Sequence, residues 1–130
     1  EEILRTYNST TQINFNNLSI NLFLRSKEEL FHLAESVLNK VNKTLKKKYN
    51  FKIIDTKVEA GSGSLPIEKI ESIAISIGSH NISANKISNA LRTSYTPVFN
   101  YINNKVIYID LKAIILVLGR CTLALCVEEC

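Results

Sequence analysis

The sequence reads Phe51-Lys-Ile-Ile-Asp-Thr-Lys-Val-Glu59, then enters the loop Gly61-Ser-Gly-Ser-Leu-Pro66, and then reads Ser72-Ile-Ala-Ile-Ser-Ile77. The outer two segments are rich in β-branched residues and alternate between apolar and polar positions, which predicts strands with one buried face. The glycines permit backbone conformations that other residues avoid, and Pro66 restricts Leu65 to extended conformations. We therefore predict two antiparallel strands joined by a loop with exposed backbone, although Gly, Ser and Pro clusters are also ordinary turn chemistry.

A helix is predicted upstream of the first strand. Ser26-Lys-Glu-Glu29 is a capping box, in which the Ser26 hydroxyl accepts from the amide of Glu29 and the Glu29 carboxylate accepts from the amide of Ser26. After it, apolar residues recur at helical spacing, at Leu30, Ala34, Val37, Val41 and Leu45. This spacing predicts one long helix that packs a single face on the sheet.

A second helix and a hairpin are predicted downstream. Ser83 is a candidate N-cap, and Ile87 and Leu91 form the apolar face of a short helix that ends by Ser94. A strand over 98–102, a turn at Asn103-Asn104 and a returning strand over 106–109 follow. Together the elements predict an α+β fold, a two-layer sandwich with a mainly antiparallel sheet covered by helices on one face.

The two ends differ in character. Residues 1–7 have helical spacing and residues 8–21 are polar and Asn-rich, so we interpret 1–21 as the end of a larger domain's helix and a linker. We then assign 22–130 to one small domain. The segment 112–130 has apolar residues on all sides and needs a covering surface, which argues for a partner chain or a further domain of the parent protein. Because the chain does not begin with Met, we expect it to be part of a longer protein.

Composition narrows the classes of protein. The 130 residues are 45% hydrophobic, enough for one compact core, and the net charge of +4 would favour an anionic partner. The basic run at 46–48 fits either a helix end or contact with nucleic acid. The cysteines at 121, 126 and 130 lack Cys-x-x-Cys spacing or a nearby His, so we predict free thiols and no metal site. Without a signal peptide or spanning segment, we expect a cytoplasmic protein with no membrane contact.

Several motifs recur in an order that is characteristic of one family. They are Gly61-Ser-Gly-Ser-Leu-Pro66, Ile73-Ala-Ile-Ser-Ile77, Leu91-Arg92, Pro97-Val98 and Asp110-Leu111. In this order and spacing the chain resembles the carboxy-terminal domain of bacterial selenocysteine synthase, the L-seryl-tRNA(Sec) selenium transferase. The resemblance runs from about Glu1 to about Leu116 and makes Leu22-Phe-Leu24 the entry strand of the small domain.

The resemblance implies a function that depends on more than this chain. Selenocysteine synthases resemble fold-type-I pyridoxal-phosphate enzymes and convert seryl-tRNA(Sec) to selenocysteinyl-tRNA(Sec) with selenophosphate. The resemblance therefore implies a homo-oligomeric transferase whose cofactor is bound outside this chain. It also implies that this chain contains no catalytic, cofactor-binding or metal-binding residue. The loop Gly61, Ser62, Gly63, Ser64, Leu65 and Pro66 would border the active-site cleft of the parent enzyme.

Three basic residues are candidate anion contacts, namely Arg25, Arg92 and Lys112. Arg25 has an alternative role, pairing with a carboxylate on the domain's own surface. Two positions depart from the family pattern, since Tyr101 and Lys112 stand where relatives usually have Arg. Loss of a guanidinium removes bidentate recognition of carboxylate or phosphate. A related pyridoxal-phosphate lyase with another substrate is therefore the first alternative.

A second alternative comes from a different class. Many RNA-binding domains are helix-covered antiparallel sheets that stack bases on exposed aromatic residues. Phe99 and Tyr101 on one strand of the predicted hairpin, with Tyr108 on the other, would provide such a surface. A free-standing RNA-binding or protein-interaction module is therefore the other interpretation.

Overall fold

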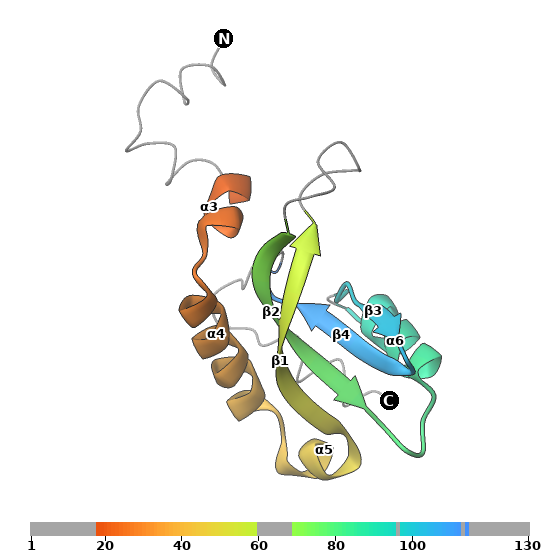
Figure 1. The fold of residues 1–130 in the computed structure, drawn as a ribbon. Helices are drawn as coiled ribbons and strands as arrows, with labels where there is room; N and C mark the ends of the chain where they lie inside the picture. Colours follow the sequence, from red (N-terminus) through yellow and green to blue (C-terminus); the bar gives the residue numbers. More distant parts are fainter. Residues whose placement is uncertain (1–17, 60–68, 96, 113, 115–130) are drawn as a thin grey trace, which may run out of the picture.

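The computed structural model describes residues 18–59, 69–95, 97–112 and 114. The chain order is helix α3 (Leu18–Leu24), α4 (Lys27–Lys40), α5 (Lys43–Lys48), β1 (Asn50–Glu59), β2 (Lys69–Gly78), α6 (Ala84–Thr93), β3 (Tyr101–Asn103) and β4 (Val106–Asp110). The strands form one antiparallel sheet in the order β1-β2-β4-β3. The predicted α+β two-layer sandwich is confirmed (Figure 1).

The sheet is built around the long hairpin of β1 and β2. These strands pair over ten residues each, from Asn50 opposite Gly78 to Glu59 opposite Lys69. β2 starts at Lys69, three residues before the predicted strand that begins at Ser72. Strand β4 pairs with the other edge of β2, which makes β2 a central strand.

One hydrophobic core fills the space between the sheet and helices α4, α5 and α6. In β2 the side chains of Ile73, Ile75 and Ile77 are each at most 1% exposed. The helices contribute the buried residues Leu30, Ala34, Val37, Leu45, Ile87 and Leu91. Because these side chains belong to one cluster, the helices pack on the same face of the sheet.

Helix α4 begins as the sequence predicts, but it ends early. The Ser26 hydroxyl accepts from the amide of Glu29 at 3.1 Å, and the Glu29 carboxylate accepts from the amide of Ser26 at 3.0 Å. The prediction of one helix through Leu45 is wrong, because Val41 adopts an extended conformation and Asn42 caps the separate helix α5. All five predicted apolar positions are buried nevertheless, so the core face was assigned correctly.

Three other predictions need correction. Leu22-Phe-Leu24, expected as a strand, is the end of helix α3, so the last four residues of the predicted linker over 8–21 are helical. Strand β3 covers 101–103, whereas the prediction was a strand over 98–102; residues 98–100 are not in a strand. The hairpin is confirmed, but its turn is Asn104-Lys105, whose φ values of 50° and 63° match a two-residue left-handed turn.

The short helix α6 confirms its prediction. The hydroxyl of Ser83 accepts from the amide of Lys86, and Ile87 and Leu91 are buried. No helix in the described part of the chain is long and apolar enough to cross a membrane.

Candidate functional site

The predicted Gly-Ser loop is carried by the β1–β2 hairpin. Glu59 ends β1 and Lys69 begins β2; the two pair in register, and their side chains form an ion pair at 3.8 Å. Residues 61–66 themselves lie outside the described residues. Helix α3 lies toward the same end of the sheet as the tips of these strands (Figure 1).

Arg25 and Lys112, two of the candidate anion contacts, are brought together by the fold. The Lys112 ammonium donates a 2.6 Å hydrogen bond to the backbone carbonyl of Arg25, and the Arg25 guanidinium donates one of 2.7 Å to the carbonyl of Ile114. Lys112 is only 7% exposed. The pair therefore holds the α3–α4 junction against the chain that leaves β4. Among the described residues, Arg25 contacts a backbone carbonyl and not the predicted carboxylate.

Asp110 connects three segments beside this pair. Its carboxylate accepts from the Ser72 hydroxyl at 2.7 Å, the Thr56 hydroxyl at 2.9 Å and the Lys112 amide at 2.9 Å. Strand register explains the cluster, because Thr56 lies opposite Ser72 while Asp110 lies opposite Ala74 on the other side of β2. The sequence motif identified Asp110 but not its hydroxyl partners, which only the register reveals.

Arg92, the third candidate anion contact, lies apart from the other two. Its guanidinium donates a 2.6 Å hydrogen bond to the carbonyl of Asn100, just before edge strand β3. The Asn100 side chain is buried, accepts from the Ser88 hydroxyl and donates to the carbonyl of Val98 at 3.0 Å. Arg92 therefore ties α6 to the chain that enters β3. The residue is exposed and its guanidinium has further N–H donors, so its role as an anion contact stays a prediction.

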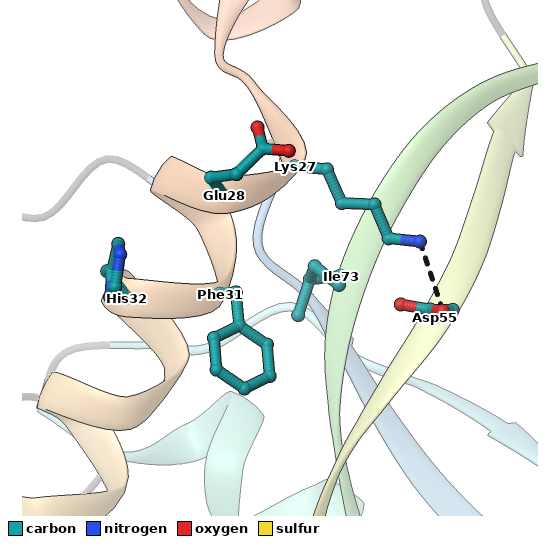
Figure 2. Close-up of a pocket in the computed structure, with 6 residues that line it drawn as sticks. All are labelled: Lys27, Glu28, Phe31, His32, Asp55 and Ile73. Atoms are coloured by element: carbon teal, nitrogen blue, oxygen red, sulfur yellow. Dashed lines mark ion pairs between the residues drawn. The ribbon is translucent and has the colours of Figure 1, made fainter.

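A shallow pocket of about 260 Å³ opens between the start of α4 and the sheet. Its lining residues are Lys27, Glu28, Phe31, His32, Asp55 and Ile73. Figure 2 shows Lys27 reaching from α4 across the pocket to Asp55 on β1, where the two form an ion pair at 3.0 Å. The hydrogen bond to Asp55 raises the pKa of Lys27. His32 is exposed, and its ring lies 3.6 Å from the carboxylate of Glu35.

Neither Lys27 nor Lys112 has the setting of a lysine that binds pyridoxal phosphate. A lysine that forms a Schiff base needs an unprotonated amine, which enzymes obtain by lowering its pKa. Lys27 has the opposite setting, because Asp55 holds it protonated. Lys112 is buried against a carbonyl and does not line the pocket. Among the described residues, no cluster of His, Cys, Asp and Glu suits a metal ion either.

The aromatic residues of the hairpin are arranged differently from a base-stacking surface. Tyr101 and Tyr108 stack on each other with ring centroids 5.3 Å apart. Phe99 is 85% exposed, but it precedes β3 and is not part of the sheet. Burial raises the pKa of Tyr101, and the nearby Asp110 and Tyr108 add to the increase. Each tyrosine therefore covers one face of the other's ring, and that face is not open to a base.

Comparison with known proteins gives one consistent result. A family model described as L-seryl-tRNA selenium transferase matches residues 1–115. An L-seryl-tRNA(Sec) selenium transferase from Alkaliphilus oremlandii is 43% identical over 56 residues, which are 43% of this chain and 12% of the relative.

Two further relatives carry the same name and are matched over more of the chain. The protein from Clostridium botulinum strain Hall is 26% identical over 96 residues, covering 74% of this chain and 21% of the relative. The protein from Mannheimia succiniciproducens is 29% identical over 117 residues, covering 88% and 25%. The matched part of the chain thus spans no more than a quarter of the length of these relatives.

Proposed function

The chain belongs to the L-seryl-tRNA selenium transferase family, and we propose that it is the carboxy-terminal domain of a selenocysteine synthase. The parent enzyme would convert seryl-tRNA(Sec) to selenocysteinyl-tRNA(Sec) with selenophosphate, as a cytoplasmic homo-oligomer that uses pyridoxal phosphate. The observation that carries this proposal is the family match over residues 1–115.

The cofactor would be held by the rest of the parent enzyme. Two lysines above support this, because one is kept protonated by Asp55 and the other is buried against a carbonyl. Pyridoxal phosphate supplies the electron-sink chemistry when it is bound. The small domain would contribute by positioning and by closing the cleft so that water is excluded.

The end of the sheet that carries the Gly-Ser loop is the part proposed to face the cofactor-bearing domain. Helix α3, which includes the last residues of the predicted linker, lies toward this end (Figure 1). The ion pair of Lys27 with Asp55 attaches the start of α4 to the middle of β1. Helix α3 and the strand ends that carry the Gly-Ser loop thus lie toward the same end of the sheet. A domain that borders a cleft would have this arrangement.

The departure at Lys112 is compatible with this function. Lys112 donates to the Arg25 carbonyl inside the domain, so replacement of the family's usual Arg changes an internal contact. The relatives compared above all carry the selenium transferase name, which favours that activity over a lyase with another substrate. The mutual stacking of Tyr101 and Tyr108 likewise gives less support to an RNA-binding sheet surface.

The proposal is tested with the longer protein that contains this chain. Incubated with seryl-tRNA(Sec), selenophosphate and pyridoxal phosphate, it should form selenocysteinyl-tRNA(Sec), and the 130-residue chain alone should retain no cofactor after desalting. Removal of residues 22–130 should abolish the reaction. A longer protein that binds the cofactor but leaves seryl-tRNA(Sec) unchanged would overturn the assignment, as would full activity without the domain.

A further inference from the structure

An apolar surface lies on both sides of the junction between helices α3 and α4. Phe23 and Leu24 at the end of α3 are 50% and 61% exposed, and Phe31 in the first turns of α4 is 42% exposed. Large apolar side chains exposed so close together along the chain are candidates for a contact site. We call Phe23, Leu24 and Phe31 the junction surface.

The described chain ends beside this surface. The carbonyl of Ile114, the last described residue, accepts a 2.7 Å hydrogen bond from the guanidinium of Arg25, which is the residue next to Leu24. The ammonium of Lys112 fixes the same junction by donating to the Arg25 carbonyl at 2.6 Å. Ile114 also packs against the hydrophobic core. Two hydrogen bonds therefore bring the backbone that leads into residue 115 to the junction.

The segment 115–130 has the composition that such a surface would bind. It begins Ile115-Leu-Val-Leu118 and continues with Thr122-Leu-Ala-Leu-Cys126, and Arg120 is its one charged residue before Glu128. The family model ends at residue 115, so residues 116–130 lie beyond the matched part. A short apolar segment needs a partner surface to leave water.

The reach of the segment is sufficient. Sixteen residues, from 115 to 130, span about 24 Å even when fully helical at 1.5 Å per residue. Helix α3 has 7 residues and is therefore about 10 Å long by the same rise. From a start beside Arg25, the segment is long enough to pass along α3.

We propose that residues 115–130 dock on the junction surface of their own chain, with Leu116 and Leu118 among the side chains that cover Phe23, Leu24 and Phe31. The Arg25–Ile114 and Lys112–Arg25 hydrogen bonds start the segment in the correct place. The proposal concerns this chain's own fold and stands independently of the proposed enzyme activity.

The native cysteines in the segment provide the test. In the 130-residue chain, Phe23→Cys should form an intramolecular disulfide with Cys121 or Cys126 under oxidised glutathione, identified by peptide mapping. Lys47→Cys, at an exposed position of α5, is the matched control and should form no such disulfide. Hydrogen exchange gives the second measurement, because α3 amides should exchange at least several-fold faster when Leu116 and Leu118 are replaced by Asp.

The outcomes separate the occupants of the surface. Equal disulfide formation by Phe23→Cys and Lys47→Cys would show an undocked segment and overturn the proposal. Disulfides that join two isotopically distinct chains would overturn it in favour of a second copy. Absence of the disulfide, together with unchanged exchange of α3, would also overturn it and leave the surface to another domain.

Discussion

The ammonium of Lys112 donates a 2.6 Å hydrogen bond to the backbone carbonyl of Arg25, 87 positions earlier in the chain. The Arg25 guanidinium in turn binds the carbonyl of Ile114. Two residues that the sequence marks as anion contacts therefore connect the first and last described segments of the domain. Each side chain has further N–H donors beyond these hydrogen bonds, so their role as anion contacts stays a prediction.

Asp110 should contribute more stability than an exposed acid. Asp110→Ala leaves the Ser72 hydroxyl, which is 0% exposed, without its acceptor, and an unsatisfied buried polar group costs about 1–3 kcal/mol. Asp55→Ala is the control, because Asp55 forms an exposed ion pair and such pairs contribute less than about 1 kcal/mol. Urea unfolding measures both losses, and equal losses would contradict the assigned role.

The sequence predicts those parts of the fold that depend on local patterns. Alternation over 72–77 identified the central strand, and the capping box at Ser26 fixed the start of α4. The break at Val41-Asn42 was missed because Val37, Val41 and Leu45 keep helical spacing across it and are all buried. The local signal was Asn42, whose side chain accepts from the amide of Thr44 at 3.1 Å.

The site was harder to predict than the fold. Arg25 and Ile114 are separated by 89 positions, so their contact depends on how α3 and the end of β4 meet in three dimensions. The Thr56–Asp110–Ser72 cluster likewise depends on the register of three strands. Local sequence contains neither relationship. The Gly-Ser loop at 61–66 lies outside the described residues, so its role stays a prediction.

The buried face of α4 and α5 should be essential for folding. Val41 is 3% exposed, and Val41→Asp places an unpaired carboxylate in the core at a cost of several kcal/mol, comparable to a small domain's total stability. Lys47→Asp, at an exposed position of α5, should cost less than about 1 kcal/mol through the helix dipole. Circular dichroism melts compare the two, and equal melting temperatures would show that the face is wrongly assigned.

The phenol of Tyr49 should be dispensable. The side chain is 1% exposed and its hydroxyl has no hydrogen-bond partner among the described residues, whereas its ring packs edge to face on Phe51 at 6.2 Å. Tyr49→Phe should therefore leave the free energy of unfolding unchanged or raise it by about 1 kcal/mol. Tyr49→Ala, which removes the ring, should cost about 3–5 kcal/mol. A loss above 1 kcal/mol in Tyr49→Phe would reveal a partner for the hydroxyl.

Alkaline pH should destabilise the domain through Tyr101. Burial, and then the charge of Asp110, raise the pKa of its phenol above the ordinary value of 10.0. A raised folded pKa gives stability that is present below the unfolded pKa and is lost as pH rises through the folded pKa. The free energy of unfolding should therefore fall above about pH 10, and less steeply in Tyr101→Phe. The same decline in both proteins would rule out this contribution.

The Gly-Ser loop should affect activity without affecting the stability of the domain. Glu59 and Lys69 already pair at its base, so the hairpin does not depend on residues 61–66 to set its register. If the loop borders the cleft, Gly63→Val in the longer enzyme should lower activity. The free energy of unfolding of the domain should stay within about 1 kcal/mol, provided Gly63 is not at positive φ. Selenocysteinyl-tRNA(Sec) formation and thermal melts measure the two effects. If the loop is only a turn, substitutions at Ser62, Gly63 and Ser64 should lower activity and stability in proportion. That result would count against a role at the cleft.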